Sequence, residues 1–88
     1  MKKIFCNISL FDLHQRVYLI DTDANKKNCI GITDLDRIPE MICSLCDNKK
    51  VYKVILSGNK EYNNELSNNI LEYSKMNYNN NNIEIEVI

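Results

Sequence analysis

Cysteine is the residue type in this chain whose spacing most suggests chemistry, because Cys43 and Cys46 form a C-x-x-C pair. In redox pairs of the thioredoxin type the first cysteine lies at a helix N-terminus, where the dipole stabilises the thiolate. This pair instead falls in the last turns of a predicted helix. A structural zinc site needs further ligands, and Cys6 and Cys29 stand apart without a second paired motif. We expect reduced cysteines that fill interior space, with no metal and no cofactor.

The chain has one histidine, His14, which lies near Asp12 in a predicted hairpin turn. A histidine and an aspartate together can act as general acid and base, but the sequence places no nucleophile near them. We therefore interpret His14 as an exposed turn residue. We predict no catalytic residue and no enzymatic activity.

The segment Ser57-Gly58-Asn59-Lys60 follows one predicted strand and opens a predicted helix. Ligands in open α/β sheets often bind at the carboxyl ends of strands, and the free amides at a helix N-terminus suit a small anion or a nucleotide. Asp12, at the end of the first predicted strand, would be the neighbour of this turn. An ordinary turn with Ser57 or Asn59 as the N-cap accounts for the same residues, and we favour that interpretation.

The strands that position these residues follow from the apolar pattern. Residues 4–10 alternate at period two, and residues 17–20 again sort onto two opposite faces. Residues 21–28 indicate a polar turn, and residues 29–32 form a short third strand. The first two strands should pair as an antiparallel hairpin.

Two helices and two more strands complete the chain. Residues 51–56 are a β-favouring run typical of a strand buried on both sides, and residues 83–88 alternate as an edge strand with one wet face. The helices are predicted from apolar stripes at three- and four-residue intervals. The first stripe comprises Leu35, Ile38, Ile42 and Leu45, and the second comprises Tyr62, Leu66, Ile70 and Tyr73.

The start of the first helix has two competing signals. Thr33-Asp34-Leu35-Asp36 matches a capping box in its acidic form, which predicts a start there. Pro39 removes a hydrogen bond beyond the first turn of such a helix. The helix therefore either begins at Asp36 or kinks.

The element order βββαβαβ predicts a single α/β (α+β) domain over residues 1–88. A meander of three strands followed by two right-handed crossovers gives a five-stranded mixed sheet of order 3-2-1-4-5. Both crossovers advance in one direction, so both helices fall on the same face. The other face is left uncovered, and we expect Phe5, Phe11, Tyr18 and Ile20 to lie on it as an interaction face.

Charge and hydropathy exclude several classes of partner. With 11 basic and 12 acidic residues, the chain has no overall field that would attract nucleic acid or an anionic membrane. No apolar run is long enough to span a bilayer, and the N-terminal residues are followed by a strand-like alternation. We expect a cytoplasmic protein with no membrane contact, for which nucleic-acid binding is disfavoured. A second copy or another protein is the expected partner.

The meander followed by two helical crossovers resembles the core of the ribonuclease-H-like fold. Members that cleave nucleic acid hold divalent metal with an aspartate in strand one and another acid at the end of strand four. Here strand one has Asn7 and Ser9 at its middle, and strand four ends in Ser57-Gly58. The phosphate-binding glycine loops of the actin-like ATPase branch are also missing, since the glycines are Gly31 and Gly58 alone. The resemblance implies the fold and argues against the nuclease activity.

These inferences combine into one expected function. We expect a small non-catalytic protein-interaction module that acts through its uncovered sheet face. In size, composition and lack of enzyme motifs it is similar to accessory proteins of phages and mobile elements, some of which bind a host factor or a defence component. The alternatives are a small-ligand or nucleic-acid binding domain that uses the Ser57–Lys60 turn, and a degenerate ribonuclease-H-like nuclease.

Overall fold

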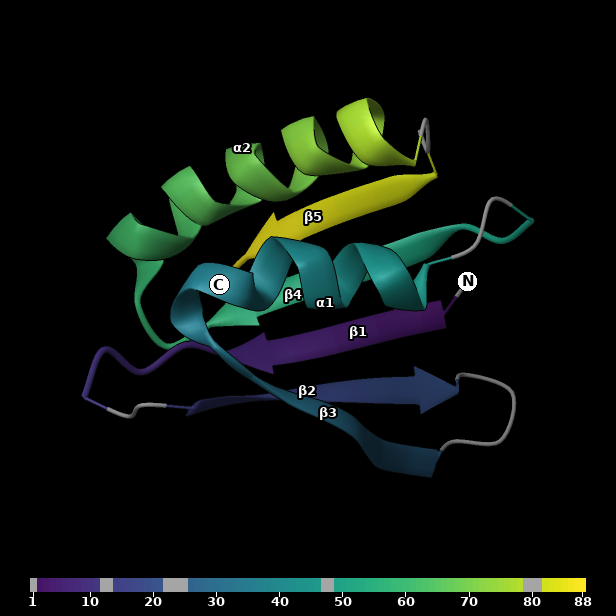
Figure 1. Ribbon diagram of the computed structural model, residues 1–88. Coiled ribbons are helices and arrows are strands. Elements are labelled where there is room, and N and C mark those ends of the chain that lie inside the picture. The colour runs from purple at the N-terminus through teal and green to yellow at the C-terminus, as the bar shows by residue number, and fades with distance from the viewer. Residues whose placement is uncertain (1, 12–13, 22–25, 47–48, 79–81) are drawn as a thin grey trace.

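The computed structural model describes residues 2–11, 14–21, 26–46, 49–78 and 82–88 (Figure 1). Within them the chain forms five strands, a short 3-10 helix and two α-helices. The elements are β1 (Lys2–Asn7), β2 (His14–Asp21), β3 (Lys26–Asp34), η1 (Leu35–Arg37), α1 (Ile38–Leu45), β4 (Tyr52–Ser57), α2 (Lys60–Asn77) and β5 (Ile83–Val87).

The strands form one mixed sheet of order β3-β2-β1-β4-β5, which confirms the predicted topology. β1 pairs antiparallel with β2, and β2 pairs antiparallel with β3. β1 pairs parallel with β4, and β4 pairs parallel with β5. The hairpins need only short turns, whereas each parallel pair needs a helical crossover, and the two crossovers are the α-helices.

Both α-helices cover the same face of the sheet, as Figure 1 shows. Alternate residues of the central strands point into the core beneath them, and Ile4 and Leu56 are fully buried there. Ile42 of α1 and Ile70 of α2 close this core from above. Burial of each such side chain contributes about 1.5–3 kcal/mol relative to exposure, so this layer accounts for most of the stability.

The α-helix α1 begins later than the capping-box pattern predicts. Thr33 and Asp34 belong to the end of β3, and Arg37 is the N-cap residue, with no side-chain cap hydrogen bond. The start at Ile38 places Pro39 within the first turn, where its missing N–H needs no partner. The prediction of a capping box at Thr33 is therefore wrong, and the later start removes the need for a kink.

The strand bounds differ from the predicted ones at the first hairpin. β1 ends at Asn7 instead of residue 10, although the Ile8 N–H still donates to the Ser57 carbonyl oxygen at 2.6 Å. The second and third strands are longer than predicted, and their ends take in Asp21 and residues 26–28 of the predicted polar turn. The cause is pairing: each strand extends as far as its neighbour offers backbone partners.

The helix α2 buries a slightly different stripe from the predicted one. Leu66 and Ile70 are buried as expected, but the outer positions of the stripe are Asn63 and Ser74, while Tyr62 and Tyr73 are half-buried. β5 confirms the predicted alternation, with Ile83 buried and Glu84 exposed. Neither helix in the described part of the chain is long and apolar enough to cross a membrane.

Candidate functional site

The candidate site is the sheet face opposite the two helices, which we call the open face. Its central row crosses three strands, because Phe5 of β1 pairs with Tyr18 of β2 on one side and with Ile55 of β4 on the other. The neighbouring residues along these strands, such as Ile4 and Val54, point the opposite way into the core. Period-two alternation therefore places apolar side chains on both faces of the same strands.

Burial along this row is incomplete. Ile55 is only 5% exposed although it lies on the open face. Phe5 and Tyr18 are half-buried, and Ile32 of the edge strand β3 is 58% exposed. The row thus leaves the rings of Phe5 and Tyr18 partly in contact with solvent.

Charged side chains flank the apolar row. The Lys53 ammonium on β4 lies 3.0 Å from the Glu86 carboxylate on β5, and both side chains are partly exposed. Lys3 lies beside Lys53 in the register of β1 and β4. Arg16 on β2 and Glu84 on β5 are exposed. An apolar centre with a charged rim is the usual composition of a protein–protein interface.

The structure brings together only part of the predicted interaction face. Phe5 and Tyr18 lie side by side on the open face, as predicted. Ile20 lies in β2 opposite Lys3, but its side chain is outside the described part of the structure. Phe11 lies in a turn beyond β1 and is 99% exposed, so its predicted place on the sheet is wrong. The period-two pattern continues past Asn7, but the pairing of β1 with β2 does not.

The predicted ligand turn is occupied by ordinary capping contacts. The Asn59 side chain accepts a hydrogen bond from the Tyr62 N–H at 2.9 Å, as an N-cap residue does. The Ser57 carbonyl accepts from the Ile8 N–H. Lys60 is exposed at the first position of α2, and Asp12 lies outside the described residues. These contacts support the interpretation of the segment as a strand-to-helix turn.

Gly58 within this turn is required by packing. Its φ of +106° lies in the region that side chains disfavour, and a Cβ atom there would lie 1.9 Å from the Ile8 carbonyl oxygen. The turn therefore presses directly against the chain that leaves β1. Close approach of two backbones accounts for this glycine without a ligand.

The cysteines that the structure describes are buried packing residues. Cys6, Cys43 and Cys46 are buried free thiols, as predicted, and the side chain of Cys29 is outside the described part. Burial raises the pKa of the Cys6 thiol to about 12. Burial also raises the pKa of Cys43 to about 11, against a smaller lowering by a hydrogen bond with Ser74. Both thiols are protonated at neutral pH, which is the unreactive form.

Within the part of the chain that the structure describes, Cys43 and Cys46 belong to no larger set of metal-binding groups. Among the residues that the structure describes, no three His, Cys, Asp or Glu side chains are grouped so that they could hold a metal ion. Asn7 and Ser57, where the ribonuclease-H-like resemblance would place metal-binding acids, are direct register partners. At this position the two central strands carry an amide and a hydroxyl, whereas binding of a divalent metal would need carboxylates.

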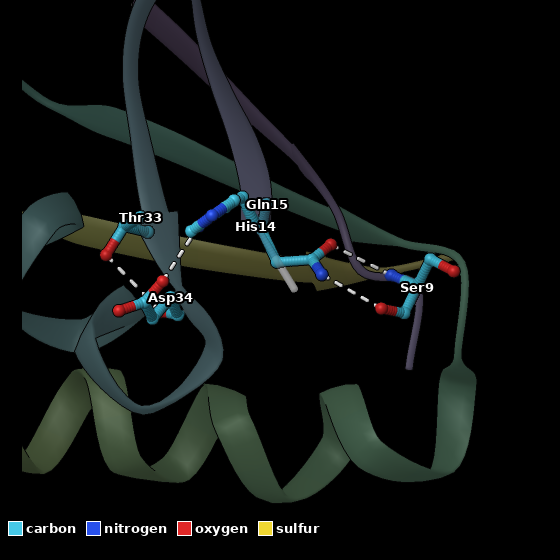
Figure 2. Close-up of polar contacts among 5 residues, drawn as sticks. All are labelled: Ser9, His14, Gln15, Thr33 and Asp34. Carbon is cyan, nitrogen blue, oxygen red and sulfur yellow. Dashed lines mark hydrogen bonds and ion pairs between the residues drawn. The ribbon is translucent and has the colours of Figure 1, made fainter. Parts of the chain in front are cut away.

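His14 has a partner that the sequence did not indicate. Its Nδ1 lies 2.8 Å from the Asp34 Oδ1, because the two residues are register partners in β2 and β3 (Figure 2). Asp34 could have been identified only with the hairpin register, which shifts at a bulge between Val17 and Tyr18. Both side chains are more than half exposed, and exposed pairs of this kind contribute roughly 0–1 kcal/mol.

A buried glutamine fixes the end of β1 beside this pair. The Gln15 side-chain amide donates to the Ser9 carbonyl and accepts from the Ser9 N–H, both at 2.9 Å (Figure 2). This double contact replaces the strand pairing that ends at Asn7. A hollow of about 590 Å³ lies next to it, lined in part by Asn7, Tyr18 and Ile32. The open face is thus concave at this end.

Comparisons with protein-family models, curated proteins and solved structures find no match for this chain. The function must therefore be argued from the site itself.

Proposed function

We propose that this chain is a small non-catalytic protein-interaction module that binds protein through the open face. The observation that carries the proposal is the apolar row of Tyr18, Phe5 and Ile55, which lies on the face that α1 and α2 leave uncovered. A sheet with apolar residues on both faces is stable in water when a second layer covers each face. The chain supplies one such layer, and a partner would supply the other.

The residue types on this face favour a protein partner. Aromatic side chains and arginine are enriched among the residues that dominate binding energy at protein interfaces. Phe5, Tyr18 and Arg16 lie on adjacent strands next to the hollow that Ile32 helps to line. Apolar area removed from water contributes about 25 cal/mol per Å², so a partner that covers the partly exposed rings gains directly from them.

The wider setting of this interaction remains part of the proposal. We propose that the chain binds a host factor or a defence component. Three features support this role: the small size of the chain, its lack of a recognisable enzyme motif, and its general similarity to accessory proteins of phages and mobile elements. The capping contacts of Asn59 give no support to a ligand at the Ser57–Lys60 turn. Protein binding is therefore the function that the geometry supports best.

A matched set of surface variants tests this function. Tyr18→Asp and Ile32→Asp place a charge on the open face, whereas Met76→Asp places the same charge on the exposed side of α2. Each tagged variant is used to capture proteins from extract of the source cell, after circular dichroism has shown that it is folded. We expect the two open-face variants to lose the captured proteins and Met76→Asp to retain them. Loss with Met76→Asp alone would assign binding to the helical layer and refute the proposal.

A further inference from the structure

We infer that a hollow bordered by α1 and α2 binds an organic cation, which lies against the rings of Tyr73 and Tyr78 and beside the Glu40 carboxylate. The hollow has a volume of about 640 Å³ and is lined by residues of β2, β3, α1 and α2. Pockets for small organic ligands measure about 300 to 1,000 Å³, so this hollow has the size for one. Its aromatic end lies on the helical layer, away from the apolar row of the open face. The inference therefore does not depend on the proposed function.

The aromatic end of the hollow is a pair of tyrosine rings at the C-terminal end of α2. The ring centroids of Tyr73 and Tyr78 lie 6.0 Å apart, and the ring planes are tilted by 45°. Tyr73 is half-buried and Tyr78 is 41% exposed, so a ligand can reach both rings. A cation within about 6 Å of a ring centroid is attracted by the electrons of the ring face. At this spacing, one cation can lie within that distance of both centroids.

The Glu40 carboxylate adds a full negative charge beside these rings. Glu40 is exposed in the first turn of α1 and lines the same hollow as the two tyrosines. It forms no ion pair with another residue that the structure describes. Burial raises the pKa of Tyr73, and the negative charge of Glu40 raises it further, as expected for a carboxylate near this ring. A positively charged ligand would therefore gain from both rings and from this carboxylate.

The other charged side chains of the hollow lie nearer its opposite end. His14 and Asp34 contact each other at 2.8 Å, so the Asp34 carboxylate already has a partner (Figure 2). Arg37 is exposed at the N-cap of α1, three residues before Glu40, and its positive charge would oppose a bound cation. The hollow thus combines an attractive group of side chains with one that repels. Substitutions of the two kinds should change cation affinity in opposite directions.

The composition of the site favours a cation that is weakly hydrated. Aromatic rings replace lost water poorly for a primary ammonium, whereas quaternary ammonium and guanidinium groups are recognised by such rings. The half-buried Met41 side chain also lines the hollow and offers apolar surface to the alkyl part of a ligand. We therefore expect an alkylammonium or a guanidinium compound to bind here.

The test is a chemical-shift titration of the isotopically labelled chain with two matched pairs of compounds. The first pair is choline and its neutral analogue, in which carbon replaces the charged nitrogen. The second pair is acetylarginine amide and acetylcitrulline amide, which differ in the charge of the side chain. We expect the charged member of at least one pair to shift the signals of Tyr73 and Tyr78 and to bind about tenfold more tightly than its neutral partner.

The two pairs also identify the source of the cation. A preference for choline assigns the site to a free alkylammonium compound, and a preference in the arginine pair alone assigns it to an arginine side chain. Equal affinities within both pairs would overturn the inference. Absence of binding by either cation up to about 100 mM would overturn it as well.

Single substitutions locate the bound cation. Tyr78→Leu and Glu40→Gln alter exposed side chains and should each weaken binding by about three- to tenfold, whereas Arg37→Gln should strengthen it. Tyr73→Phe retains the ring and should retain binding. Glu65→Gln is the charge-matched control, because Glu65 is exposed on α2 outside the lining of the hollow. Binding that is insensitive to both Tyr78→Leu and Glu40→Gln would place the cation elsewhere and overturn the inference.

Discussion

The two faces of the sheet differ in how completely their apolar side chains are buried. On one face, Ile4 and Leu56 have no exposed surface, because α1 and α2 cover them. On the other face, Phe5 of β1 and Tyr18 of β2 are direct neighbours in the sheet but remain half-buried. Strand alternation supplies apolar side chains to both faces, and the handedness of the two crossovers decides which face receives the helices. This difference is the basis of our proposal that the helix-covered face serves stability and the open face serves association.

The largest expected effect on the free energy of unfolding comes from a substitution on the helix-covered face. Leu56→Ala removes buried methyl groups from the core and should lower the free energy of unfolding by about 2–5 kcal/mol. Ile32→Ala on the open face removes an exposed side chain and should change the free energy of unfolding by less than about 0.5 kcal/mol. Urea unfolding of both variants measures these values. Equal losses would show that the two faces do not differ in their contribution to stability.

The next effect concerns the turn that joins the covered layer to the sheet. Gly58→Ala forces a Cβ atom against the Ile8 carbonyl at a strained φ and should cost about 3 kcal/mol. Gly31→Ala is the matched control, because its Cβ would meet only the flexible end of Met41, with the nearest atom at 3.0 Å. We expect its cost in urea unfolding to be below about 1 kcal/mol. A small cost for Gly58→Ala would mean that the turn is looser than described.

A buried polar side chain offers a way to strengthen the covered face. Asn63 on α2 is fully buried, and neither its side-chain oxygen nor its nitrogen has a hydrogen-bond partner. Asn63→Leu removes this penalty and should raise the free energy of unfolding by about 1–2 kcal/mol. The adjacent exposed Asn64 provides the control, since Asn64→Leu should leave thermal unfolding nearly unchanged. No gain from Asn63→Leu would show that the amide is satisfied in solution.

The smallest expected effect is a loss of stability at alkaline pH, which arises from the Cys6 thiol on the helix-covered face. The folded pKa of Cys6 is raised to about 12 from an ordinary value of 9.0, so the thiol ionises more easily when unfolded. Its stabilising contribution is complete below pH 9 and falls as the pH rises toward 12. At pH 10 the loss is about 1.4 kcal/mol. Cys6→Val should flatten this part of the unfolding profile, and an unchanged slope would contradict burial of the thiol.

The sheet topology could be predicted from the sequence because it depends on a few strong rules. Three alternating segments, two amphipathic segments and right-handed crossovers leave essentially one strand order. The start of α1 was harder to predict, because a local capping pattern at Thr33 competes with strand pairing. In the structure Thr33 belongs to the paired strand β3. Pro39 was the better signal for where the helix begins.

The candidate site was only partly predictable. Phe5 and Tyr18 follow from alternation, but the place of Phe11 depends on where strand pairing stops. His14 and Asp34 are 20 residues apart, and a bulge shifts the register between them. The burial of Asn63 depends on how α2 rotates against its neighbours, which an apolar pattern does not report. Each of these features rests on pairing or packing between distant segments.

The most direct test of the central claim is to map by nuclear magnetic resonance which residues of the isotopically labelled chain lie at the interface with a captured protein partner. Binding changes the chemical shifts of groups at the interface more than those elsewhere. Our account predicts the largest changes at Phe5, Tyr18 and Ile32 on the open face. Changes confined to Met76 and the exposed side of α2 would contradict it.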